Sequence, residues 1–181
     1  MKKYLSIVVL LSLFMVGCSD QIDINSPVEK TANKKVKWLT IPNSGLAVEG
    51  TKTWSKTITG SIGGLFKGTK SLSSTVSAYV EVWVPGGSFS GTKTISATLN
   101  SSTLYADFAP SPTTFNMPIY YTVEYFGVNL NGVDPNNVDF CYIDGSGNMV
   151  KAEYAELFVE DGWICVVDAK LPHFSRYGFV N

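Results

Sequence analysis

Tyr79-Val80-Glu81-Val82-Trp83-Val84 alternates, residue by residue, between valines and larger or charged side chains. Successive side chains of a β-strand point to opposite faces, so the three valines share one face and Tyr79, Glu81 and Trp83 share the other. Similar alternation, or a short run of β-branched and aromatic residues, recurs along the chain. The further candidate strands are residues 51–58, 94–99, 119–125, 138–143, 154–159, 163–168 and 175–180.

Turn-forming residues separate these candidate strands. Asp161-Gly162 lies between two apolar runs and predicts a two-residue hairpin loop with positive φ at both central positions. Asp144-Gly145-Ser146-Gly147-Asn148 is expected to close a second hairpin. No stretch has a sustained helical period. Eight or nine short strands without intervening helices predict one all-β domain, a single antiparallel β-sandwich, over residues 49–181.

The N-terminal residues have the organisation of a bacterial lipoprotein signal. Two lysines precede an apolar run over residues 5–16, which is shorter than the roughly 20 residues of a transmembrane helix. Met15-Val16-Gly17-Cys18 resembles the lipobox, whose cysteine thiol receives diacylglycerol before cleavage. We therefore expect residues 1–17 to be a removable signal peptide and Cys18 to become an acylated N-terminus. An ordinary signal peptide with an incidental cysteine, or an uncleaved anchor, is the alternative.

Residues 18–48 are expected to form the lipidated cysteine and a flexible linker. The segment is polar, is interrupted by Pro27 and Pro42, and contains Lys34-Lys35-Val36-Lys37. Trp38-Leu39-Thr40-Ile41 is a candidate short strand that docks on the domain. The expected location is the cell envelope, where lipid on Cys18 attaches the protein to a membrane, the outer one if the source is Gram-negative.

Charge and motif content exclude several function classes. The chain after the signal has 12 basic and 15 acidic residues, so it lacks the clustered positive charge that nucleic-acid binding requires. It has one histidine, His173, and no nucleophile elbow, phosphate loop or zinc-ligand spacing. The loop that begins at Asp144 has Met149 and Ala155 where a calcium loop needs Gly and Glu. The sequence therefore predicts no cofactor, no metal site and no conventional enzyme.

Two further residue groups leave alternatives open. Cys141 and Cys165 lie in apolar strand-like runs, where they form either a disulfide, as exported proteins permit, or two buried free thiols. Tryptophans such as Trp54 and Trp83 either fill the core or, if exposed on one sheet face, form a platform that stacks on sugars or contacts a protein.

Three segments together resemble the ZU-five domain, the β-sandwich named for zona occludens proteins and uncoordinated-type netrin receptors. The resemblance covers about residues 50–181. The segments are Thr59-Gly60-Ser61-Ile62-Gly63-Gly64, Val82-Trp83-Val84-Pro85-Gly86-Gly87-Ser88-Phe89, and Leu171-Pro172-His173-Phe174-Ser175-Arg176-Tyr177-Gly178-Phe179-Val180. The last is the most specific.

The resemblance implies a fold and raises one chemical possibility. In some relatives the His-Phe-Ser sequence cuts itself between Phe and Ser. Carried over, the Ser175 hydroxyl would attack the carbonyl of Phe174, His173 would assist proton transfer, and water would hydrolyse the resulting ester. Other relatives keep the fold without cleaving. If Phe174 instead fills the core and His173 lies at a strand end, the segment is structural.

The sequence as a whole predicts a membrane-anchored lipoprotein whose single domain is a non-catalytic protein-interaction or structural module. The alternatives are self-cleavage between Phe174 and Ser175 and carbohydrate binding. The expected partners are the membrane, through the lipid on Cys18, and an unidentified protein or glycan.

Overall fold

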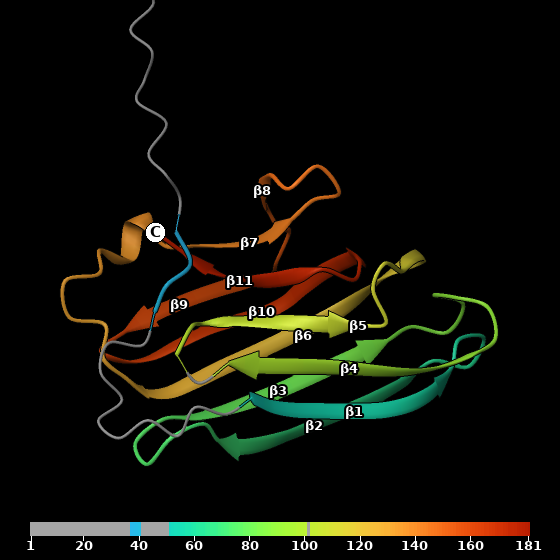
Figure 1. Ribbon diagram of the computed structural model, residues 1–181, viewed down its shortest axis with the longest axis horizontal. Coiled ribbons are helices and arrows are strands. Elements are labelled where there is room, and N and C mark those ends of the chain that lie inside the picture. Colours follow the sequence, from blue (N-terminus) through green and yellow to red (C-terminus); the bar gives the residue numbers. More distant parts are fainter. Residues whose placement is uncertain (1–36, 41–50, 101) are drawn as a thin grey trace, which may run out of the picture. The chain divides into compact units, whose positions relative to one another are not determined.

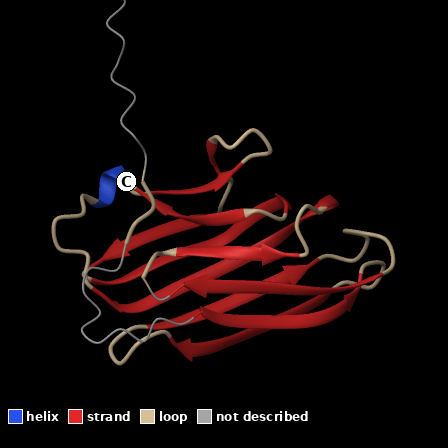
Figure 2. Ribbon diagram, viewed as in Figure 1, coloured by secondary structure: helices blue, strands red, loops and turns tan. Residues whose placement is uncertain are grey.

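A computed structural model describes residues 37–40, 51–100 and 102–181. Two antiparallel sheets pack against each other around one hydrophobic core, which confirms the predicted all-β sandwich (Figure 1). Figure 2 shows strands throughout; among the described residues the only helix is η1, the 3-10 turn Pro135–Asn137. No helix within these ranges has the length and apolar character needed to span a membrane.

One sheet has six strands and the other has five. The six-stranded sheet follows the order β1 (Thr51–Thr59), β4 (Thr92–Asn100), β5 (Tyr105–Ala109), β11 (Arg176–Val180), β7 (Asp139–Ile143) and β8 (Met149–Lys151). The five-stranded sheet follows the order β2 (Gly64–Ser71), β3 (Ser77–Val84), β6 (Thr114–Val128), β10 (Gly162–His173) and β9 (Glu156–Glu160).

The valine alternation in β3 sets the inner and outer faces of the five-stranded sheet. Val80, Val82 and Val84 are buried in the core, whereas Trp83 between them is 49% exposed. The predicted division of β3 into a valine face and a Trp83 face is confirmed, and the structure adds that the valine face is the inner one. This division follows from the pleat, because one face of the strand must cover the other sheet and the opposite face is left to solvent.

The predicted hairpins are present, but one differs in backbone geometry. Trp163 pairs with Glu160, so Asp161-Gly162 forms the two-residue turn between them, and Gly162 is also the first residue of β10. Gly162 has φ of 79°, whereas Asp168 is the only described non-glycine residue with positive φ. The expectation of positive φ at both loop positions is therefore wrong. In the β7–β8 hairpin the Asp144 carboxylate accepts backbone hydrogen bonds from Ser146 and Asn148.

The described residues form eleven strands, more than the eight or nine expected. The strands missed were β2, β5 and β8. In β2 only Phe66 is buried, and β8 has three residues, so neither shows a clear hydrophobic pattern. Strand β10 also runs past the expected end at Asp168, where a bulge shifts its register against β6.

The described part of the expected linker docks on the six-stranded sheet. Trp38 forms an isolated bridge with Val180, and the backbone of Leu39 bonds to Phe179 and Leu104 at 2.8 Å (Figure 1, blue segment). Leu39 is buried, so the predicted docking is present, although the described residues form isolated bridges rather than a strand and Ile41 lies outside them. The remainder of residues 18–48, with Cys18, and the expected signal peptide over residues 1–17 lie outside the described residues.

Two core tyrosines provide a matched test of this packing. Within the described chain, the buried Tyr121 hydroxyl has no hydrogen-bond partner, whereas the Tyr177 hydroxyl donates to the His173 carbonyl oxygen at 2.8 Å. We expect Tyr121→Phe to raise the free energy of unfolding by about 1 kcal/mol and Tyr177→Phe to lower it by about the same amount. Urea denaturation measures both values. Equal destabilisation by the two variants would contradict the assignment.

Candidate functional site

The His-Phe-Ser segment connects β10 to β11, and its phenylalanine belongs to the core. Phe174 is 2% exposed; its ring centroid lies 5.6 Å from that of Phe108 and 4.7 Å from that of Phe115. His173 ends β10, with its imidazole edge-on to Tyr142 at 5.0 Å. Phe174 thus fills the core, and His173 lies at a strand end, as in the structural alternative.

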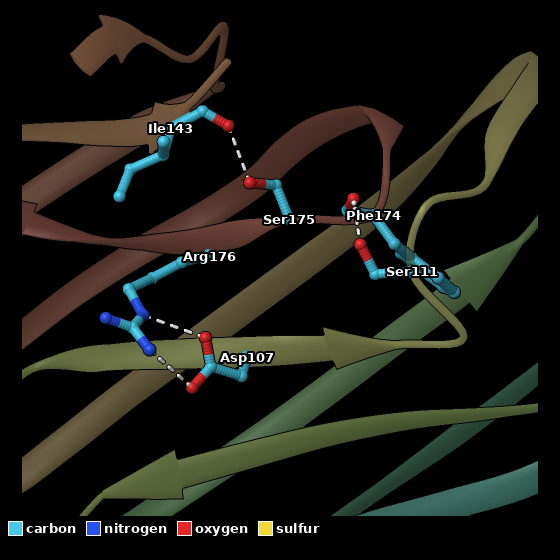
Figure 3. Close-up of polar contacts among 6 residues, drawn as sticks. All are labelled: Asp107, Ser111, Ile143, Phe174, Ser175 and Arg176. Carbon is cyan, nitrogen blue, oxygen red and sulfur yellow. Dashed lines mark hydrogen bonds and ion pairs between the residues drawn. The ribbon is translucent and has the colours of Figure 1, made fainter. Parts of the chain in front are cut away.

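The two groups that self-cleavage would use have other partners. The Ser175 hydroxyl donates to the Ile143 carbonyl oxygen at 2.6 Å, and the Phe174 carbonyl oxygen accepts from the Ser111 hydroxyl at 3.1 Å (Figure 3). No hydrogen bond in the described structure joins His173 to Ser175. Cleavage would require the serine proton to pass to a base, and a peptide carbonyl is not one.

The strand that follows this segment, β11, pairs with β5 on one side and with β7 on the other. Arg176 makes two hydrogen bonds to Asp107 of β5, at 2.8 and 3.1 Å, and its guanidinium lies 4.1 Å from the Tyr105 ring centroid. The hydrogen bonds that Arg176 donates to the Asp107 carboxylate raise the pKa of Arg176, so the guanidinium stays charged. This pair helps to set the register of β5 against β11.

The two cysteines are free, buried thiols, one on the outward-facing side of each sheet. Cys141 of β7 follows the core residue Phe140, and Cys165 of β10 lies between the core residues Ile164 and Val166. Alternation therefore directs each thiol away from the core, and the possible disulfide does not form. Burial raises the pKa of Cys141 to about 11 and that of Cys165 to about 12, so both stay protonated and unreactive.

The two alternatives for the tryptophans apply to different residues, because Trp54 fills the core and Trp83 is exposed. Trp54 is 5% exposed and donates its indole N–H to the Gly68 carbonyl oxygen at 2.8 Å, because its side of β1 faces the other sheet. Trp83 is on an outer surface.

Within the described chain no cluster of three or more His, Cys, Asp or Glu side chains has the arrangement of a metal site.

Trp83 belongs to a row of three side chains on the outer face of the five-stranded sheet, of which Leu65 and Trp83 are exposed and Tyr120 is half-buried. Leu65 of β2 pairs with Trp83, and Trp83 pairs with Tyr120 of β6. The Trp83 and Tyr120 ring centroids are 4.9 Å apart with planes inclined by 30°. We call this row, which consists of Leu65 and the two aromatic side chains Trp83 and Tyr120, the aromatic row.

The aromatic row leads into a cavity at the edge of the sandwich, which we call the edge pocket. Lys170 of β10 pairs with Tyr120 and also lines the cavity, so the two features are continuous. The edge pocket has a volume of about 270 Å³. Its lining residues are Pro118, Tyr142, Lys151, Glu153, Lys170 and Pro172. Sequence reasoning missed this pocket, because its residues come from separate segments without a shared motif.

The charged groups of the edge pocket are paired. Lys170 Nζ is 2.7 Å from Glu153 Oε2, and Lys151 Nζ is 2.9 Å from Asp139 Oδ2. Each lysine pKa is raised by the hydrogen bond to its carboxylate, and Lys170 lowers the pKa of Glu153. Burial alone would raise the pKa of Asp139, but hydrogen bonds from Lys151 and Tyr154 outweigh it and lower that pKa. All four groups are therefore charged at neutral pH and cancel.

The outer face of the six-stranded sheet has a different character. Cross-strand hydroxyl pairs between β1 and β4 hydrogen-bond to each other at 2.9 to 3.1 Å. The pairs are Thr53–Thr98, Thr57–Thr94 and Thr59–Thr92. Exposed threonines of this kind are satisfied in water and gain little from a partner. The aromatic row and edge pocket are therefore the stronger candidate site.

No known protein family, curated protein or solved structure matches this chain. The resemblance to the ZU-five domain therefore stays a prediction from its three motifs.

Ser175→Ala tests whether the His-Phe-Ser segment is structural. Removing the hydroxyl takes a donor from the Ile143 carbonyl, so we expect the free energy of unfolding to fall by about 1 kcal/mol. Under denaturing conditions we expect wild type and variant to have the same intact mass apart from the substituted oxygen. Ser146→Ala, in an exposed turn, is the control. A wild-type mass lacking residues 175–181, restored in Ser175→Ala, would establish self-cleavage instead.

Proposed function

We propose that this protein is a lipid-tethered, non-catalytic interaction module of the cell envelope whose contact surface includes the aromatic row and the edge pocket. The observation that carries the proposal is the Trp83–Tyr120 pair, in which half-exposed Trp83 stacks on half-buried Tyr120 next to the edge pocket. Covering exposed apolar area of this kind with a partner is energetically favourable. Tethering through Cys18 would keep the module at a membrane.

The absence of catalysis in this proposal is supported by how polar groups are used at both candidate sites. The Ser175 hydroxyl and Phe174 carbonyl are each held by another residue, and both lysines of the edge pocket are neutralised by carboxylates. The alternative of self-cleavage would require Ser175 to leave Ile143. Because β11 pairs with β5 and β7 on its two sides, such a cut would leave the released strand bound in the sheet.

Lipidation is tested by replacing the thiol of Cys18. We expect the wild-type protein to incorporate radiolabelled palmitate and to sediment with membranes, because two or more acyl chains give stable attachment. Cys18→Ser should lose the label and move to the soluble fraction. Cys141→Ser is the control, since this thiol is buried in the folded domain. Equal labelling of wild type and Cys18→Ser would refute the anchoring.

The contact surface is tested by placing a photo-crosslinking phenylalanine analogue at one position at a time in cells. Leu65, at the end of the aromatic row, should give an adduct with an envelope component. Ser55, exposed on the outer face of β1, is the matched control and should give none. Adducts of equal yield from both positions, or none from Leu65, would count against this surface.

A further inference from the structure

We propose that the aromatic row and the edge pocket together bind a neutral glycan, with one sugar ring in the pocket and the chain continuing over Tyr120 and Trp83. This inference rests on the proposed function, because it names the class of partner for the same surface. It follows from the shape, the charge balance and the mixed polar and aromatic character of the site.

The shape fits a linear ligand that begins in a cavity. Leu65, Trp83, Tyr120 and Lys170 lie on β2, β3, β6 and β10, so the row crosses the strands at right angles. Adjacent strands are about 4.8 Å apart, and the row therefore extends roughly 14 Å before it meets the pocket. A cavity of about 270 Å³ is at the small end for ligand sites, which suits one sugar ring better than a folded partner.

The charge balance favours a neutral ligand. Each lysine that lines the edge pocket has a carboxylate partner within 3 Å. The next pair along the sheet, Lys67 and Glu81, is also matched, with Nζ and Oε2 3.5 Å apart. An anion or a cation would have to break one of these pairs, whereas a ligand without charge can bond to both members.

The chemical groups match the two sides of a sugar. A pyranose ring has an apolar face of C–H groups and a rim of hydroxyls. Trp83 and Tyr120 offer aromatic surface for the apolar side. Lys170 and Glu153 place a donor and an acceptor together, with side chains 44% and 78% exposed, and such paired groups suit neighbouring hydroxyls, each of which both donates and accepts.

The second apolar group on this face lacks these features. Phe126, Phe158 and Trp163 lie at the other end of the sheet, and the Phe158 and Trp163 rings stack on each other at 5.5 Å. Glu160, rather than a charge pair, adjoins this group in the register. It therefore serves as an internal control for nonspecific apolar contact.

Affinity electrophoresis tests the proposal with the acylated full-length mature protein in detergent micelles. The gels contain neutral polysaccharides (mannan, xylan or a soluble glucan), anionic polygalacturonate or cationic chitosan. We expect at least one neutral polymer to retard the protein. Tyr120→Ala should weaken this binding by about fivefold or more, and Phe158→Ala should leave it unchanged. Circular dichroism confirms that each variant is folded.

A charge variant keeps the test decisive if Tyr120→Ala does not fold. Glu153 is 78% exposed, so Glu153→Gln is expected to fold while leaving Lys170 without its partner. We expect this variant to bind the neutral polymer more weakly and to gain retardation by polygalacturonate. Unchanged neutral binding and no gain with the anion would place the ligand elsewhere.

Three outcomes would contradict the proposal that the ligand is a neutral glycan. They are no retardation by any neutral polymer at about 1 mM sugar units, retardation by a charged polymer alone, and equal loss of binding in Tyr120→Ala and Phe158→Ala. If a protease-sensitive adduct still forms from Leu65 in cells, the proposed contact surface is supported and only the assignment of a glycan ligand is contradicted. If no adduct forms and no polymer binds, both the proposed function and this inference fail.

Discussion

The burial of β11 between β5 and β7 is the constraint on which the sandwich and both candidate sites depend. Tyr177 and Phe179 are fully buried, and Phe174, just before the strand, stacks on Phe108. A strand that is hydrogen-bonded on both edges and packed on one face cannot shift without unpacking the core. The same pairing sets the position of β7, whose Tyr142 reaches the edge pocket.

The two outer faces of the sandwich differ in what a partner could gain from them. The threonine pairs of β1 and β4 already satisfy one another, so covering them would remove hydration without exposing new bonding capacity. On the opposite sheet, half-exposed Trp83 keeps apolar area in water, and covering it is favourable by roughly 25 cal/mol per Å². This difference, rather than any motif, directs attention to the five-stranded sheet.

The sequence predicted the fold well because one face of every strand must be buried. Alternation correctly divided the β3 side chains between two faces, and turn residues located both hairpins. Alternation alone does not say which face meets the other sheet, so Trp54 and Trp83 looked equivalent until pairing placed one inside and one outside. Strand β2 was missed for a related reason: as an edge strand it buries only Phe66 and needs no hydrophobic repeat.

The candidate site depends on a single inserted residue that the sequence pattern does not reveal. Ile164 and Val166 face the core, so strict alternation would send Lys170 inward as well. The bulge between Val166 and Ala169, with positive φ at Asp168, reverses the parity, and Ala169 becomes the next core residue. Lys170 then projects outward beside Tyr120 and meets Glu153. Bulges redirect side chains in this way. The aromatic row and the edge pocket are therefore continuous because of this bulge.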